Sequence, residues 1–160
     1  MPRNIIVCYD HSPSSRFAIQ WAVSKKIFLT DDSVTLATAL DEDVAAIEGG
    51  ALAVPNVVGG AGDFFVTDYT QRVEKMEKDA EYELKEAVEI IRQHVGQVHA
   101  VLLRGDAKSS LVDYANTNQA DLVIVGQRGL GWVKRRLLGS VSDHLSHQLK
   151  MPILIVRDSN

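Results

Sequence analysis

The sequence predicts an α/β protein built on a doubly wound parallel sheet, with helices on both faces. Short, unbroken apolar runs typical of strands buried on both faces alternate along the chain with segments of helical period. This alternation requires parallel strands joined by helical crossovers, which are right-handed. The length of 160 residues suits one domain with a full core, so residues 1–160 are expected to form a single domain.

Five segments are expected to be strands, because each is short, apolar and next to turn-forming residues or a helical segment. They are Ile5–Tyr9, Val34–Leu40, Val98–Leu103, Leu122–Val125 and Ile153–Val156.

Four segments have the period of amphipathic helices: residues 14–28, Thr70–Val95, Lys108–Asn118 and Val141–Leu149. Asp106 and Ser140 are the expected N-caps of the last two, because their side-chain oxygens can accept N–H bonds of the first turn. The longest segment has one apolar stripe, made of Val73, Met76, Ala80, Leu84, Ala87, Val88, Ile91 and Val95, and Gly96 is its expected stop.

Residues 41–68 have no sustained period and are rich in glycine at 59–63. A loop of this length is usually a functional lid or a disordered segment, and both interpretations stay open.

Composition and charge exclude several classes of protein. The formal charge of −4 and the pI near 5.7 argue against nonspecific binding of nucleic acid. No apolar run is long enough to cross a membrane, and residues 1–4 lead into a strand rather than a signal peptide. A soluble cytoplasmic protein that binds neither nucleic acid nor a membrane is expected. Cys8, the one cysteine, lies in an apolar run, which favours burial over redox chemistry.

Glycines stand at the places where an anion site needs them. Gly126 ends a predicted strand, Gly129 follows it, and Gly139-Ser140 precedes the last predicted helix. Close backbone approach and the N–H groups of a helix start favour phosphate oxygens. Between Asp121 and Asp143 the chain carries four cations (Arg128, Lys134, Arg135 and Arg136) and no acidic residue. A local positive field would attract a phosphate, although a solvated basic loop is the alternative.

The pattern Gly-x2-Gly-x9-Gly-Ser resembles the nucleotide-binding signature of the universal stress proteins, in particular of their ATP-binding branch. The match extends to Gly-Leu-Gly at 129–131 and Leu-Leu-Gly-Ser-Val-Ser at 137–142. The resemblance implies a Rossmann-like, adenine nucleotide alpha hydrolase-like sheet with strand order 3-2-1-4-5. Its winding would reverse between the first and fourth strands, which brings Asp10 close to Gly126.

The resemblance also implies where a nucleoside would lie. Asp10 would bind the ribose, although an Asx turn or an N-cap is the alternative for an aspartate at a strand end. Main-chain groups near Ala39 would pair with the adenine edge. Cys8 and Tyr9 would wall the base on one side, and Val125 on the other. His11 stands where the family often has glycine, so its side chain would either narrow the ribose pocket or point outward.

Two segments would wrap the phosphates of ATP, ADP or AMP, and Mg²⁺ would be held mainly by the phosphates. The segments are Gly126, Gln127, Arg128 and Gly129, and Gly139, Ser140, Val141 and Ser142. Gln127 replaces a small hydroxyl residue common in the family, which would move one phosphate contact to the main chain. Asp143, at the third position of the helix, would favour the helix dipole but repel an anion.

Motifs for catalysis are missing. The sequence has no GxxxxGK[ST] loop, no GxSxG elbow and no obvious acid–base pair near the glycines, so no catalytic residue is assigned. His144 and His147 could share a helix face, but they lack further ligand partners, so no metal site is expected. The sequence therefore favours a nucleotide-dependent regulator or sensor of the stress response. Slow ATP hydrolysis or self-phosphorylation is the enzymatic alternative, and a flavodoxin-like FMN carrier is another.

The last predicted strand indicates a homodimer. With the order 3-2-1-4-5, Ile153, Leu154, Ile155 and Val156 form an uncharged edge strand, and such edges recruit other strands. Pairing with the same strand of a second copy would close the assembly with two-fold symmetry. The alternative is a monomer whose edge is covered by the 41–68 segment.

Overall fold

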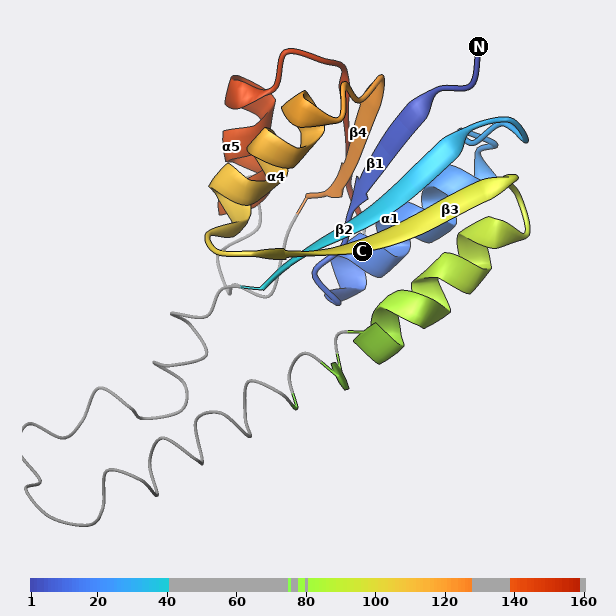
Figure 1. Cartoon of the computed structure of the whole chain (residues 1–160), viewed down its shortest axis with the longest axis horizontal. Helices are drawn as coiled ribbons and strands as arrows, with labels where there is room; N and C mark the ends of the chain where they lie inside the picture. The colour runs from blue at the N-terminus through green and yellow to red at the C-terminus, as the bar shows by residue number, and fades with distance from the viewer. Residues whose placement is uncertain (41–74, 76–77, 80, 128–138, 159–160) are drawn as a thin grey trace, which may run out of the picture.

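The computed structural model describes residues 1–40, 75, 78–79, 81–127 and 139–158 (Figure 1). The predicted loop at 41–68 lies outside these residues. In chain order the elements are β1 (Asn4–Cys8), α1 (Pro13–Ser24), β2 (Ser33–Leu40), a helix over 81–92, β3 (Gln97–Arg104), α4 (Ala107–Thr117), β4 (Leu122–Gly126), α5 (Ser140–Gln148) and β5 (Ile153–Val156). In the part of the chain that the structure describes, no helix is both long and apolar enough to span a membrane.

The five strands form one parallel sheet in the order β3-β2-β1-β4-β5, which confirms the predicted fold class and strand order. At the centre, Ile6 of β1 lies opposite Thr35 of β2 and Val123 of β4. The winding reverses between β1 and β4, so the carboxyl ends of these two strands border the crevice where sheets of this class bind ligands.

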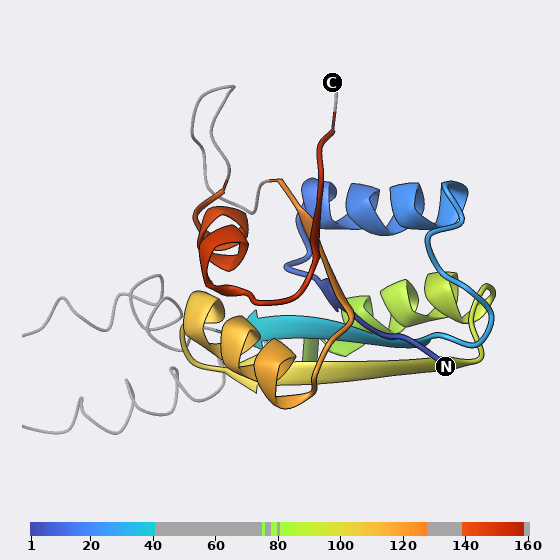
Figure 2. The same ribbon diagram turned by 90° about the horizontal axis from the view of Figure 1, so that it is seen from above.

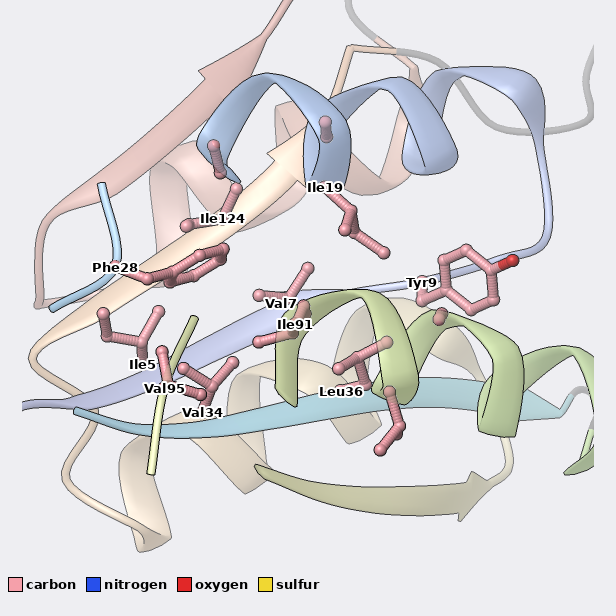
Figure 3. Close-up of a cluster of buried hydrophobic side chains, with 14 of the residues drawn as sticks. Ile5, Val7, Tyr9, Ile19, Phe28, Val34, Leu36, Ile91, Val95 and Ile124 are labelled. Carbon is pink, nitrogen blue, oxygen red and sulfur yellow. The ribbon is translucent and has the colours of Figure 1, made fainter. Parts of the chain in front are cut away.

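The sheet separates two apolar layers, because successive side chains of a strand point to opposite faces. Ile5, Val7 and Tyr9 face α1 and the helix at 81–92 (Figure 3), whereas Ile6 and Cys8 face α4 and α5. Figure 2 shows these two helix pairs on opposite sides of the sheet. Both faces of β1 are therefore buried, which explains why its sequence is an unbroken apolar run.

The first helix is shorter than predicted. It ends at Ser24 rather than residue 28, because Lys26 has a left-handed backbone with φ of 54°. The Ile27 N–H then donates to the Ala22 carbonyl at 2.9 Å, closing the helix end. Phe28, only 6% exposed, enters the core after this turn. Its spacing had matched the helical period although it lies beyond the helix.

The apolar stripe of the long predicted helix is confirmed for its described members. Leu84, Ala87, Val88 and Ile91 are buried on the helix at 81–92, whereas Val73, Met76 and Ala80 lie outside the described residues. Val95 is also buried, although the helix has ended by then.

The helix at 81–92 ends before the predicted boundary at Val95, so Gly96 is not its immediate stop but the last residue before β3. The packing at Gly96 explains the glycine. The Gly96 N–H donates to the Thr30 carbonyl at 2.8 Å, and a Cβ atom at this position would lie 3.2 Å from the same oxygen.

An ion pair fixes the amino-terminal edge of the sheet, away from the β1–β4 crevice. Asp32 is 2% exposed and accepts from Arg3 Nε at 2.9 Å, Arg3 Nη2 at 2.6 Å and the Leu29 N–H at 2.7 Å. Burial alone would raise the pKa of Asp32, but the bonds from Arg3 and Leu29 outweigh it and hold the pKa below its usual range. The pair therefore stabilises the fold while Asp32 is ionised.

Candidate functional site

The end of β1 is held in place by its neighbours. The Tyr9 N–H donates to the Ala37 carbonyl at 2.9 Å, and the Thr38 hydroxyl donates to the Tyr9 carbonyl at 2.8 Å. Thr38 is 2% exposed, so this bond is shielded from water. Asp10 thus follows a residue whose two main-chain groups are both bound to β2.

Asp10 forms an Asx turn, the alternative expected for an aspartate at this position. Its Oδ1 accepts from the Ser12 N–H at 3.1 Å and from the Ser12 hydroxyl at 2.5 Å. The N-cap of α1 is Ser12, whose Oγ accepts from the Ser15 N–H at 3.2 Å, and Pro13 follows it at the first helical position. Among the described residues none donates a hydrogen bond to Asp10 Oδ2, so this oxygen can bind a ligand hydroxyl.

His11 adopts a left-handed backbone with φ of 63°, a conformation that glycine reaches at lower cost. Its ring packs edge-on against Tyr9, with ring centroids 4.8 Å apart, and its Nδ1 lies 2.9 Å from Glu83 Oε2. The side chain is 22% exposed, so the expectation that it could point outward is wrong.

Gly126 at the end of β4 is required by close packing. A Cβ atom here would lie 2.7 Å from the Ser14 carbonyl oxygen and 2.8 Å from the Ser14 hydroxyl. The absence of a side chain therefore lets the first turn of α1 rest directly on the end of β4. Reasoning from the sequence assigned this glycine to phosphate approach and missed Ser14, which brings the start of α1 to the crevice.

The start of α5 differs from the prediction by one residue. The N-cap is Gly139, with φ −62° and ψ 152°, and Ser140 is the first helical residue. Asp143 therefore occupies the fourth helical position rather than the third. No side chain caps this helix. Three first-turn N–H groups, those of Ser140, Val141 and Ser142, consequently point out of the helix start without an intrahelical acceptor.

Two predicted phosphate donors are already used within the protein. The Gly139 N–H donates to the Gln127 carbonyl at 2.7 Å, and the Ser142 hydroxyl lies 3.0 Å from the carbonyl oxygens of Gln127 and Gly139. Ser142 is 2% exposed, which fits this internal role. Both groups therefore have partners within the protein, and their binding of phosphate stays a prediction. Arg128 and Gly129, like the basic run at 134–136, lie outside the described residues.

The sheet divides the side chains expected to enclose a base differently from the prediction, which put Cys8 and Tyr9 on one side and Val125 on the other. Cys8 and Val125 belong to the layer under α4 and α5, whereas Tyr9 points to the opposite face of the sheet. Burial, and then the charge of Asp10, raises the pKa of the Cys8 thiol to about 12.

Main-chain groups at the end of β2 point toward the same crevice. Because the groups of successive residues alternate in direction, Ala39 points toward the β1 side, as Ala37 does, but beyond the last residue of β1. The predicted main-chain contact to a base is geometrically possible here.

Metal ligands do not gather in the part of the chain seen in the structure, where no group of three or more His, Cys, Asp or Glu residues could hold an ion.

Comparison with known proteins identifies the family of the chain. The model of the universal stress protein family matches residues 1–157, so the chain belongs to this family. The stress response protein NhaX of Bacillus subtilis is 27% identical, over 96% of each chain. A universal stress protein of Mycolicibacterium smegmatis is also 27% identical, but the match covers 95% of this chain and 47% of that longer protein.

Solved structures share the fold. The structure of the protein MJ0577 matches with a TM-score of 0.78 and 20% identity, over 100% of this chain and 99% of the other. A universal stress protein family protein of Arabidopsis thaliana, solved with AMP bound, has a TM-score of 0.63 and 16% identity, over 99% and 93% of the two chains. An Archaeoglobus fulgidus relative in complex with dAMP, 18% identical, matches with a TM-score of 0.53 over 97% of each chain.

Proposed function

We propose that this chain binds an adenine nucleotide, ATP, ADP or AMP, in the crevice between β1 and β4, and that it acts as a nucleotide-dependent regulator or sensor of the stress response. The observation that carries the proposal is the uncapped start of α5 beside the end of β4. Three N–H groups at a positive helix end form a site for phosphate oxygens.

Each side of the crevice would contact a different part of the nucleotide. Oδ2 of Asp10 would accept from ribose hydroxyls, while Oδ1 remains in the Asx turn that fixes the carboxylate. Main-chain groups of Ala39 would pair with the base. The N–H groups of Ser140, Val141 and Ser142 would bind phosphate oxygens, and Mg²⁺ would be held mainly by the phosphates themselves. Adenine nucleotides bound to relatives support this assignment over FMN.

Binding rather than turnover is proposed as the function. Phosphoryl transfer needs a positioned nucleophile or base besides a bound nucleotide. The carboxylate of Asp10 already accepts two bonds from Ser12. We expect ATP hydrolysis far below the usual enzymatic range of about 1–10³ s⁻¹. Turnover of several per second by the unaltered protein, lost when its nucleotide site is blocked, would favour the slow ATPase or self-phosphorylating alternative.

The test of nucleotide binding is the substitution Gly139→Asp. The backbone at Gly139 is open to any residue, and aspartate is a favourable N-cap, so the free variant should be at least as stable as the unaltered protein. The new carboxylate would bind the helix-start N–H groups and repel phosphate. Millimolar ATP should raise the melting temperature of the unaltered protein, since ligand at 100 times its Kd adds about 2.7 kcal/mol. The Asp variant should show no such rise.

Gly139→Asn is the matched control. Asparagine caps the helix in the same way without the negative charge, so this variant should keep more of the response to ATP than the Asp variant. If ATP leaves the melting temperature of the unaltered protein unchanged, the proposal is wrong.

We also propose a two-fold dimer through β5, because this strand lies at the edge of the sheet and carries only Ile153, Leu154, Ile155 and Val156. The first three are partly exposed. Strand pairing across the two-fold axis would bind the unpaired main-chain groups of both edges.

A further inference from the structure

His11 follows Asp10 beside the crevice, and neither the glycine motif nor the start of α5 accounts for its backbone conformation. A residue with a side chain stands in a left-handed conformation immediately after Asp10, although glycine would adopt that conformation at lower cost. The contacts of its side chain must therefore offset the backbone cost. They are the Tyr9 ring, at 4.8 Å between centroids, and the Glu83 carboxylate, at 2.9 Å from Nδ1.

Glu83 joins three elements at one oxygen atom. Its Oε2 lies 2.9 Å from His11 Nδ1 and 3.0 Å from Arg16 Nη2. His11 belongs to the connection between β1 and α1, Arg16 to α1, and Glu83 to the helix at 81–92. We name these three residues the Glu83 clasp.

The residues of the clasp pack closely, but the His11 ring makes no aligned hydrogen bond within it. Both ring nitrogens of His11 are buried, and within the described ranges neither has a partner aligned for a hydrogen bond, although Nδ1 lies 2.9 Å from Glu83 Oε2. Burial raises the pKa of the neighbouring Tyr9, while the charge of Arg16 opposes this rise. A small displacement of the 81–92 helix would therefore change what His11 contacts, because no aligned hydrogen bond ties its ring to Glu83. The hydrogen bond within the clasp is the one that Arg16 Nη2 donates to Glu83 Oε2 at 3.0 Å.

Asp10 lies between two fixed residues. On one side, Tyr9 is bound to β2 through both main-chain groups. On the other, His11 is held against Tyr9 and Glu83. The direction of the Asp10 carboxylate therefore depends on the clasp as well as on its own bonds to Ser12.

From this arrangement we propose that His11 is a positioning residue for the nucleotide site. By closing on Glu83 it fixes Asp10 for the ribose, and it makes nucleotide affinity depend on the position of the helix at 81–92. By reciprocity, a bound nucleotide then stabilises that helix. This inference rests on the proposed function, and it adds the residue through which the site would be regulated.

The test is His11→Gly in the full-length chain, with ATP and AMP binding measured by calorimetry. Glycine removes the side-chain contacts and keeps the left-handed backbone without strain, so the variant should fold. We expect Kd to rise about fivefold or more, the lower range of coupling between sites. Lys26→Gly and Gln119→Gly are matched controls, because both residues also have positive φ, of 54° and 50°, but neither belongs to the clasp or to the proposed nucleotide contacts. Their Kd values should not change.

Two further measurements separate positioning from simple stabilisation. In a double-mutant cycle, adding Glu83→Gln to His11→Gly should weaken binding less than Glu83→Gln does alone. Hydrogen exchange at 81–92 should slow when nucleotide binds to the unaltered protein, and this protection should be lost in His11→Gly. A merely structural histidine would alter the free energy of unfolding without altering either result.

The possible failures are distinguishable. If the unaltered protein binds neither ATP nor AMP, the proposed function is wrong and this inference falls with it. If it binds them and His11→Gly binds equally well, within twofold, the nucleotide site stands and the positioning role is overturned. Loss of affinity in His11→Gly together with an equal loss in Lys26→Gly would also overturn it, because the effect would not be specific to the clasp.

Discussion

Substitution of Gly126 by alanine tests how the crevice is assembled. The added methyl carbon would meet the Ser14 carbonyl oxygen at 2.7 Å and the Ser14 carbonyl carbon at 2.8 Å. Carbon and oxygen atoms without a covalent bond rest at roughly 3.3 Å or more, so the start of α1 must move by about half an ångström. Overpacking of this kind costs about 1–3 kcal/mol. For a chain of this size a loss of 2 kcal/mol lowers the melting temperature by about 4–8 °C.

The measurement is equilibrium unfolding in urea, followed by circular dichroism, without nucleotide. Ser14→Ala provides the control, because the Ser14 hydroxyl would also lie 2.8 Å from the new methyl group. Removing the hydroxyl leaves the main-chain contacts, so the double variant should recover little of the lost stability. Full recovery, or a loss below about 0.5 kcal/mol in Gly126→Ala alone, would show that main-chain packing does not require this glycine.

Four other predictions concern the Arg3–Asp32 pair, Cys8 and the β5 edge. Because the folded-state pKa of Asp32 is lowered, its contribution to stability should be present above about pH 4 and be lost as the pH falls through the folded pKa. Urea unfolding between pH 2 and 7 should show this loss. A similar pH profile for Asp32→Asn would contradict the prediction. Arg3→Ala should lower the free energy of unfolding by about 2 kcal/mol at neutral pH. This loss is smaller than for a fully buried ion pair, because the Arg3 side chain is 37% exposed. The Cys8 thiol, buried and with its pKa raised to about 12, should react with a thiol reagent at pH 8 only after unfolding, and rapid reaction of the native protein would refute its burial. Light scattering at micromolar concentration should give twice the mass of one 17.6 kDa chain, whereas a single species at the mass of one chain would exclude the β5 dimer.

The order of the elements could be predicted because each one has a simple hydrophobic pattern. Burial of β1 on both faces produces a continuous apolar run, and the stripe through Leu84, Ala87 and Ile91 produces a helical period. The boundaries were less predictable. Lys26 ends α1 through its backbone conformation, which the identity of a lysine does not reveal.

The site was predictable in position but not in its internal bonds. Asp10 and Gly126 could be placed near the crevice because the family resemblance implied that the first and fourth strands are neighbours. The partners of Ser12, Ser14 and Ser142 could not be foreseen, since a hydroxyl group bonds to whichever acceptor the folded chain brings near it. Pro13 after Ser12 was the available signal for the true N-cap of α1. The contact between His11 and Glu83 left no local pattern, because it joins segments far apart in the sequence.

The carbonyl of Gln127 has a consequence for the connection between β4 and α5. It accepts from the Gly139 N–H and lies 3.0 Å from the Ser142 hydroxyl, so Gln127 and Gly139, the residues that flank 128–138, are held together. The entropy of closing a loop grows slowly, by about 0.6 kcal/mol for each doubling of its length. A change in the number of residues between Gln127 and Gly139 should therefore cost little free energy of folding and leave the start of α5 in place.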